Sequence, residues 1–329
     1  MPTPTIPSFP TRLLFLVNPA AGGGAGRRTA NRIETLLQEE FQQPRSRFNI
    51  ELTDPLNLLS QTVQACQDYS NIIAVGGDGT ASSILQGILK KGGETRFGLI
   101  PLGTGNDLAR SLGIYDPKIV WSKKSLTHAL QTVLSGRTHP MDLFEIEGAG
   151  FFSNYMGLGL DAQVLAGYTG LKKTSWFPWI RGSRALKFLL YGFLLVKHLL
   201  YRLPQGIHLS IHSGASESKL AAEHQLRAVI VSNTRTYAGG FHLSQESKID
   251  DGRFEVTQIR GIPDMLKILL ARYAPFRHLT RGLLQNQTDT MKWTAPPGLS
   301  YEWDGELSAE PLPATGSIRC AGQVRILLP

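Results

Sequence analysis

The order of apolar and polar positions gives the first half of the chain an alternating pattern. Short apolar runs alternate with stretches in which apolar residues recur at helical spacing. The predicted strands are Leu13–Val17, Arg47–Thr53, Asn71–Val75 and Phe97–Pro101, and the predicted helices are Arg27–Phe41, Leu58–Tyr69, Thr80–Lys90, Asp107–Leu112 and Ser125–Leu134. Strands separated by helices are typical of a parallel, doubly wound sheet.

After about Met141 the pattern changes to strands without regular helical crossovers. The predicted strands are Phe151–Met156, Ile207–His212, Leu226–Ser232, Phe254–Ile259, Thr288–Trp293 and Ile318–Leu328, with helices expected over Ser183–Tyr201 and Asp264–Ala274. Two domains are therefore predicted: an α/β domain over residues 1–143 and an antiparallel β domain over residues 144–329. A return of the last strand to the first domain is left open.

The composition of the chain limits which binding partners and which cellular compartment are expected. Lys and Arg number 34 against 26 Asp and Glu, a net charge of +8 that favours anionic partners. No nucleic-acid-binding module is recognisable, so nucleic acid is not an expected partner. Cys66 and Cys320 form neither a disulfide framework nor a zinc-ligand spacing, which fits a reducing cytosol. Met1–Pro10 lacks the features of a signal peptide, and the apolar run Phe188–Val196 is far shorter than the roughly 20 residues that cross a bilayer.

A glycine-rich loop follows the first predicted strand directly and leads into a helix. It runs from Asn18 and Pro19 through Gly22 to Gly26. Glycines let backbone amides approach phosphate oxygens at a helix N-terminus, where the helix dipole is positive. The loop lacks the Gly-Lys-Ser/Thr ending of an ordinary P-loop, and a flexible turn is an equal alternative on this motif alone.

Two further loops follow the third and fourth predicted strands. Gly76–Thr80 places Asp78 among three glycines, and Pro101–Asp107 contains Gly103, Gly105 and a second acid, Asp107. Both loops lie at the carboxyl edge of the sheet, where doubly wound folds bind ligands. A tight turn and a helix cap are the structural alternatives for the two acids. Together, the three loops carry the amides, hydroxyls and carboxylates that bind a magnesium nucleotide.

The ordered series of motifs resembles the diacylglycerol kinase and sphingosine kinase family of lipid kinases over nearly the whole chain. The series continues with Met141-Asp142, Gly157–Ala162, Asp250–Val256 and Asp304-Gly305-Glu306. The resemblance implies an α/β domain of the NAD kinase and phosphofructokinase type, a C-terminal β-sandwich, and a cleft between them where ATP meets lipid. It also implies a cytoplasmic enzyme of lipid metabolism that associates peripherally with the inner face of the membrane.

The resemblance assigns roles to individual residues. By similarity, the nucleotide is lined by Asn18, Pro19, Ala20, Ala21, Gly22, Thr53, Gly76, Gly77, Asp78, Gly79, Thr80, Ala81, Ser82, Ser83, Gly103, Thr104 and Asn106. The acids that organise catalytic Mg²⁺ are Asp78, Asp107 and Asp142, and either Asp304 or Glu306 is the base that takes the proton from the lipid hydroxyl. A second, structural Mg²⁺ is implied at Asp251 and at the backbone carbonyls of Lys248 and Arg253.

The expected activity is transfer of the γ-phosphoryl group of ATP to a lipid hydroxyl, with diacylglycerol as the acceptor. One departure from the family is Ser82-Ser83, where relatives often carry Asn-Glu. The alternatives are an NAD kinase, which shares the Gly-Gly-Asp-Gly loop, and a nucleotide-binding regulator without catalysis. Trp176–Arg181 and the apolar run after it are expected at a membrane interface, in a lipid pocket or in the core. The oligomeric state, a homodimer included, is left open.

Overall fold

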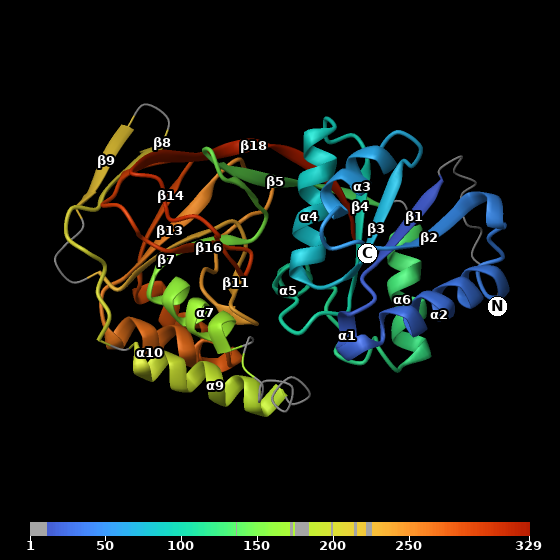
Figure 1. Ribbon diagram of the computed structural model, residues 1–329, viewed down its shortest axis with the longest axis horizontal. Coiled ribbons are helices and arrows are strands. Elements are labelled where there is room, and N and C mark those ends of the chain that lie inside the picture. Colours follow the sequence, from blue (N-terminus) through green and yellow to red (C-terminus); the bar gives the residue numbers. More distant parts are fainter. Residues whose placement is uncertain are drawn as a thin grey trace. The chain divides into compact units, whose positions relative to one another are not determined.

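The computed structural model describes residues 12–135, 137–171, 174, 184–198, 200–213, 216–221 and 226–329. The chain folds into two compact units (Figure 1). Unit 1 comprises residues 1–141 together with 322–329, and unit 2 comprises residues 142–321. The final strand of the chain therefore contributes its end to unit 1 and its beginning to unit 2.

Unit 1 is built on a parallel sheet. Its strands are β1 (Leu13–Val17), β2 (Phe48–Leu52), β3 (Asn71–Gly76) and β4 (Arg96–Pro101), in the order β2-β1-β3-β4. The end of β18 (Thr315–Leu327) adds a parallel neighbour to β4, with Ile326 opposite Phe97. Every residue of β1 is buried, because helices cover both faces of a parallel sheet.

The helices of unit 1 form a layer on each face of this sheet (Figure 1). On one face, α2 (Gly26–Glu39) and α6 (Lys123–Leu134) pack Ile33 and Leu126 against Phe15 of β1. On the other lie α3 (Leu58–Ala65) and α4 (Asp78–Lys90). Three short turns complete the unit: α1 (Ala21–Gly24), the 3-10 turn η1 (Arg45–Arg47) and α5 (Asp107–Ser111). The predicted doubly wound α/β fold is confirmed.

Unit 2 contains two antiparallel sheets. The six-stranded sheet runs β14-β13-β10-β7-β16-β17, formed by β7 (Tyr155–Gly159), β10 (Ala228–Ser232), β13 (Phe254–Ile259), β14 (Leu284–Thr288), β16 (Tyr301–Trp303) and β17 (Glu306–Leu307). In the second sheet, β18 pairs with β15 (Thr290–Thr294) and β5 (Thr138–Ile146). It is completed by β6 (Gly150–Phe152), β8 (His208–Ser213) and β9 (Ser216–Ala221), while β11 (Thr236–Tyr237) and β12 (Phe241–His242) form a separate hairpin.

The core of unit 2 lies between the two sheets. Phe144 of β5 and Met291 of β15 face Val256 of β13 and Met156 of β7 in one buried cluster. Two sheets that enclose a shared apolar core make a β-sandwich, so this prediction is also confirmed. The outer face of the six-stranded sheet is covered by α7 (Leu160–Leu171), α9 (Arg184–Lys197) and α10 (Ile262–Leu270), and α10 is followed by the 3-10 helix η2 (Ala274–Gly282) (Figure 1).

Some predicted elements of unit 2 were wrong. The predicted strand Phe151–Met156 is two strands, β6 and β7, separated at Ser153 and Asn154. The predicted strand Thr288–Trp293 is likewise divided between β14 and β15 at Asp289. Helix α7 was not predicted, because its apolar residues surround the helix and give no amphipathic stripe. Trp176–Arg181 lies outside the described residues.

Within the described part of the chain, no helix combines the length and the apolar character needed to cross a bilayer.

Candidate active site

The first loop of unit 1 is joined to the second by the side chain of Asn18. Its Nδ2 donates to Oγ1 of Thr80 over 3.1 Å, and its Oδ1 accepts from the backbone N of Ala20 over 2.9 Å. Gly22 has a φ of +61°, which favours glycine, and Gly26 packs so closely that a Cβ would lie 2.1 Å from the carbonyl oxygen of Asn18. The hydrogen bond from Asn18 to Thr80 therefore ties the first loop to the second.

The second and third loops approach each other through glycines. A Cβ on Gly103 would lie 2.5 Å from Cα of Gly77, so neither position tolerates a side chain without backbone movement. Asn106 holds the third loop in shape: its Oδ1 accepts from the N of Gly103 over 2.9 Å and its Nδ2 donates to the carbonyl of Gly103 over 2.7 Å. Asn106 itself has a φ of +54°, a conformation that asparagine adopts more readily than most residues.

Asp78 and Asp107 are brought together around Gly105. A Cβ at Gly105 would lie 3.0 Å from Oδ2 of Asp78 and 3.9 Å from Oδ2 of Asp107. Asp78 also accepts, through Oδ1, from the backbone N of Leu108 over 3.2 Å. Asp107 is buried and Asp78 is half-buried, and both carboxylates lie close to Gly105, which carries no side chain. Oxygen ligands of this kind suit Mg²⁺, so the residues present fit the expected ion.

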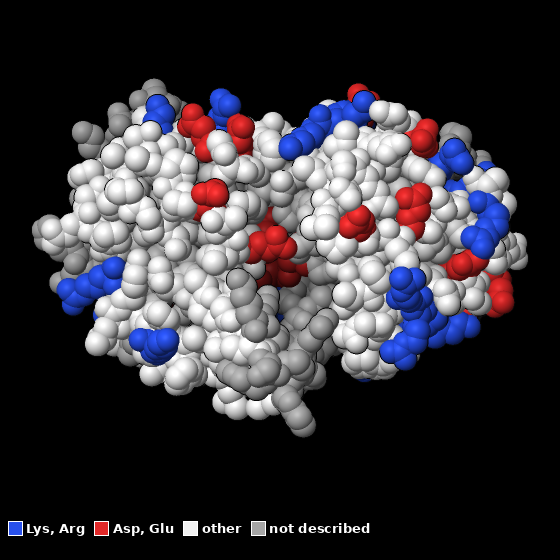
Figure 2. Space-filling model, viewed as in Figure 1, with Lys and Arg blue, Asp and Glu red and all other residues white. Residues whose placement is uncertain are grey.

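The remaining predicted nucleotide residues lie in these loops, in the first turns of α4 or, for Thr53, at the end of β2. Thr53 follows β2 and donates its backbone N to the carbonyl of Val17 over 2.9 Å. Ala20 and Ala21 lead into α1, Ser82 is buried in the first turns of α4, and Thr104 is exposed. Arg27 and Arg28 are exposed at the start of α2, and Figure 2 shows Lys and Arg gathered over this end of unit 1. These roles stay predictions.

In unit 2, Asp304 is buried and bound on both carboxylate oxygens. Oδ2 accepts from N and Oγ of Ser153 over 2.9 and 3.0 Å, and Oδ1 accepts from N of Asn154 and Tyr155 over 2.7 and 3.2 Å. These donors lie at the interruption between β6 and β7. An oxygen that already accepts two hydrogen bonds is poorly placed to take a substrate proton, so the geometry suits a structural carboxylate.

Glu306 differs from Asp304, although they belong to one turn. Asp304 and Gly305 have φ values of +49° and +81°, as in a tight hairpin turn, and Trp303 pairs with Glu306 across it. Glu306 is exposed. The backbone N of Gly305 donates to Oε2 of Glu302 over 3.0 Å, which holds the turn from its other side. The turn therefore presents Glu306 from a fixed backbone.

Behind this turn, Glu302 and Asp161 form a hydrogen-bonded pair of carboxyl groups. A Cβ at Gly157 would lie 1.7 Å from Oδ2 of Asp161 and 2.8 Å from Oε1 of Glu302, so the pair occupies the place of a missing side chain. Tyr237 donates its hydroxyl to Oδ2 of Asp161 over 3.3 Å. Burial raises the pKa of Asp161 from 3.8 to about 6, and a hydrogen bond between two carboxyl groups requires that they share a proton.

Asp142 is fully buried in unit 2 and contacts the turn that contains Asp251. Its Oδ2 accepts from the N of Gly252 over 2.7 Å, and its own N donates to the carbonyl of Ile249. Asp251 is exposed and accepts from the N of Arg253 over 3.1 Å and from Nε2 of Gln287 over 3.0 Å.

The turn can therefore supply a carboxylate and nearby carbonyls, the oxygen donors that suit Mg²⁺. Within the described residues, no group of three or more His, Cys, Asp or Glu side chains could hold a metal. A metal ligated mainly by backbone oxygens does not need such a group, and the metal roles of Lys248, Asp251 and Arg253 stay predictions.

Glu302 and Ser153 were not among the predicted site residues, and Glu255 was named only as part of the motif Asp250–Val256, without a role. Glu255 lies on β13 and is buried, and burial raises its pKa to about 7, with a smaller contribution from the charge of Asp251. The available signal for Glu302 was its place between two aromatic residues, Tyr301 and Trp303, in a strand. Ser153 carried no signal, because its partner Asp304 is 151 positions away.

Comparisons with known proteins cover both units. Residues 12–146 match the diacylglycerol kinase catalytic domain and residues 151–306 match the diacylglycerol kinase accessory domain. A Klebsiella pneumoniae (strain 342) protein named "Probable lipid kinase YegS-like" is 26% identical over 302 residues, covering 91% of this chain and 90% of that protein. The diacylglycerol kinase of Bacillus subtilis (strain 168) is 35% identical over 95 residues, 29% of each chain.

A solved structure agrees with the fold. The crystal structure of a diacylglycerol kinase from Bacillus anthracis str. Sterne superposes with a TM-score of 0.63 at 15% identity, covering 97% of both chains. The two matched domains and the relatives give the same family assignment. The chain belongs to the diacylglycerol kinase family of lipid kinases.

Proposed function

We propose that this lipid kinase transfers the γ-phosphoryl group of ATP to a hydroxyl of a membrane lipid, with diacylglycerol as the acceptor. The convergence of Asp78 and Asp107 over Gly105 carries the proposal. Phosphoryl transfer depends chiefly on positioning and on neutralising the charge of the phosphate oxygens. Glycine loops that expose backbone amides next to paired carboxylates suit both tasks.

In this proposal the three loops of unit 1 bind the phosphates of ATP. Asn18, Gly77 and Gly103 lie where the loops meet, so their backbone shape determines which amides face the ligand. A bound magnesium ion would neutralise phosphate charge beside Asp78 and Asp107. Arg27 and Arg28 add positive charge at the start of α2, where the helix dipole also favours an anion.

Glu306 is the proposed general base, and Asp304 is proposed as a positioning residue. Asp304 already accepts four hydrogen bonds, whereas Glu306 is exposed on the next strand. A carboxylate that takes the proton of the acceptor hydroxyl must be able to reach it. Fixation of the turn by Asp304 and Glu302 would give Glu306 a constant position.

Because the acceptor is a membrane lipid, the enzyme is proposed to work at the inner face of the membrane as a peripheral protein. The test is transfer of labelled γ-phosphate from ATP and magnesium to diacylglycerol, a sphingoid base, phosphatidylglycerol and NAD, with the products separated by chromatography. Glu306→Gln serves as the control for background phosphorylation.

Label in diacylglycerol that disappears in Glu306→Gln is the expected result. Label in another lipid would keep the reaction and replace the acceptor. Label only in NAD, or in no acceptor while ATP still binds, would overturn the proposed function.

A further inference from the structure

The exposed apolar side chains of the described residues are concentrated on one part of unit 2. Of the large exposed apolar residues in the described ranges, only Leu52, Leu56 and Trp121 belong to unit 1. The others lie on or beside α9, α10 and η2: Leu186, Leu189, Tyr191, Phe193, Val196, Leu200, Ile262, Leu266, Leu269, Leu270, Tyr273, Phe276 and Leu284. These thirteen residues are here called the α9–α10 face. An apolar concentration of this kind marks an interaction surface.

Helix α9 is apolar on two opposite sides. Leu194, which is 2% exposed, and Leu190 pack inward against the cluster that contains Tyr168 of α7. Leu189, Phe193 and Val196 are 65%, 63% and 68% exposed, and with Leu186 they recur every three or four residues. That spacing places them along one outward stripe of the helix. The inner face already accounts for the packing of α9, so the outer stripe needs another partner.

Helix α10 continues the same surface. Met265 and Ile268 pack against the same inner cluster as Leu190 and Leu194, while Leu266 and Leu269 are 50% and 39% exposed. In η2, Phe276 is 44% exposed, and Tyr273 just before it is 62% exposed. Both helices therefore bury one apolar side in a shared cluster and present another to the outside.

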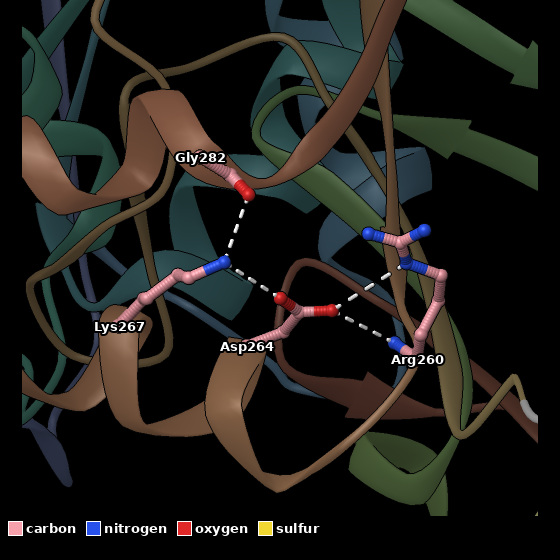
Figure 3. Close-up of polar contacts among 4 residues, drawn as sticks. All are labelled: Arg260, Asp264, Lys267 and Gly282. Carbon is pink, nitrogen blue, oxygen red and sulfur yellow. Dashed lines mark hydrogen bonds and ion pairs between the residues drawn. The ribbon is translucent and has the colours of Figure 1, made fainter.

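The charges of this surface are positive. Lys197, Arg272, Arg277 and Arg281 are exposed on it. The one acid between residues 262 and 284, Asp264, is buried and paired. Lys267 donates to Oδ1 of Asp264 over 3.0 Å and to the carbonyl of Gly282 over 2.8 Å, and Arg260 approaches Oδ2 (Figure 3). The same contacts fix the end of η2 to α10.

The view of unit 2 in Figure 2 agrees with this distribution. Over α10 it shows Lys or Arg among uncharged surface, with no Asp or Glu in view there. Apolar side chains interleaved with exposed arginines suit an anionic bilayer, which accepts the apolar groups below its headgroups and attracts the cations. A second copy of the chain would instead bring the same arginines against these in a symmetric contact.

We infer that the α9–α10 face docks the enzyme on an anionic lipid bilayer, with the apolar stripe inserted and Arg272, Arg277 and Arg281 at the headgroups. The inference deepens the proposed function and rests on it, since a lipid acceptor has to be reached at a bilayer. It assigns membrane attachment to unit 2, leaving the glycine loops of unit 1 for the nucleotide.

The test is cosedimentation of the full chain, without ATP, with vesicles of equal parts phosphatidylcholine and phosphatidylglycerol or of phosphatidylcholine alone. Leu189→Glu with Phe193→Glu, and Leu266→Glu with Leu270→Glu, should each weaken binding to the anionic vesicles about tenfold or more. Leu56→Glu, at a site that is 93% exposed in unit 1, is the matched control and should bind as the parent does.

The contribution of the arginines is tested by the double variant Arg277→Gln with Arg281→Gln. Its matched control is the double variant Lys90→Gln with Lys124→Gln, at two exposed positions of unit 1. The first pair should weaken binding to the anionic vesicles alone, and the second pair should not. Melting temperature and phosphorylation of a short-chain, water-soluble acceptor verify that each variant is folded. Vesicle binding is measured without turnover, so failure of the proposed kinase reaction would appear separately, as absent phosphorylation of the soluble acceptor by an enzyme that still binds vesicles.

Equal vesicle binding by the α9–α10 variants and the Leu56→Glu control would overturn the inference. So would variants that change a dimer into a monomer while vesicle binding stays constant, because the face would then be a contact between copies.

Discussion

The two units hold their candidate site residues by different physical means. In unit 1 the three loops are shaped by glycines and by two asparagine side chains, those of Asn18 and Asn106, and the acids Asp78 and Asp107 lie at the edge of that backbone surface. In unit 2 the backbone is shaped by buried carboxylates: Asp304 binds the break between β6 and β7, and Glu302 binds the turn at Gly305. In unit 1 the glycines, which lack side chains, let the loops approach each other. In unit 2 buried carboxylates accept hydrogen bonds from the backbone and hold it in place.

This difference predicts which substitutions each unit tolerates. A glycine loop fails when an atom is added, because backbone would meet side chain at less than contact distance. A carboxylate-centred turn fails when charge is removed, because backbone N–H groups lose their acceptor in a buried place. Substitution of Glu306 should affect turnover but not stability, since its side chain is exposed and its proposed role is that of the general base.

Glu306→Gln is expected to have the largest effect. Loss of a general base lowers turnover by about 10²–10⁴-fold, while the exposed position predicts an unchanged melting temperature and unchanged ATP binding. Turnover of labelled ATP with diacylglycerol, calorimetry and nucleotide titration measure the three quantities. If Glu306→Gln keeps the turnover of the parent, Glu306 is not the base, and Asp304 becomes the candidate for that role.

Asp304→Asn should act mainly on stability. Asparagine tolerates the positive φ of this position, so the turn itself is permitted. Hydrogen bonds to charged groups contribute about 1.5–3 kcal/mol each, and the amide loses charge and turns a donor toward the N–H groups of 153–155. The free energy of unfolding should fall by about 3 kcal/mol in urea titrations. Unchanged stability together with lost turnover would instead identify Asp304 as the base.

Gly103→Ala tests the rule for unit 1. The added Cβ would lie 2.5 Å from Cα of Gly77 and 2.7 Å from Oδ1 of Asn106, so the two loops must separate. Overpacking of this kind costs about 1–3 kcal/mol, and ATP affinity should fall with it. Gly170→Ala, where no atom lies within 4 Å, is the matched control. ATP binding of Gly103→Ala equal to that of Gly170→Ala would show that loop spacing does not determine the nucleotide site.

The sequence predicted unit 1 more completely than unit 2, for a physical reason. Each loop of unit 1 follows directly after a buried strand, so Asn18, Asp78 and Asp107 are placed by local pattern and by the common edge of a parallel sheet. β1 has the predicted bounds, Leu13–Val17, and the helices agree to within a few residues except at the end of α3, where the prediction extended to Tyr69.

In unit 2 the decisive contacts join distant positions. The break at Ser153 is stabilised by Asp304, and Gly157 is small because Asp161 and Glu302 fill its side-chain space. The spacing of apolar residues and their strand propensity are local signals. A prediction based on them therefore joined β6 and β7 into one strand and gave no reason for a glycine at position 157. The motif Asp304-Gly305-Glu306 was found only as part of an ordered series. The different roles proposed for its two acids follow from the burial of Asp304 and the exposure of Glu306, which the sequence does not reveal.

The smallest expected effect concerns the carboxyl pair of unit 2. Asp161 has a folded pKa of about 6 against an ordinary value of 3.8, so between these values the folded protein binds more protons than the unfolded chain. This group therefore stabilises the fold below about pH 4, and its contribution is lost as the pH rises to about 6. Asp161→Asn keeps a donor toward Glu302 and removes this proton-linked contribution.

The melting temperature of Asp161→Asn relative to the parent should therefore rise between about pH 4 and about pH 6, and calorimetry at several pH values measures it. Asp116→Asn gives a control of opposite sign, because a hydrogen bond from Ser125 holds the pKa of Asp116 below its usual value. Its relative melting temperature should fall as the pH rises. Parallel curves for Asp161→Asn and the parent would mean that the pair shares no proton, and the turn at Gly305 would then be organised by an ionised Glu302 alone.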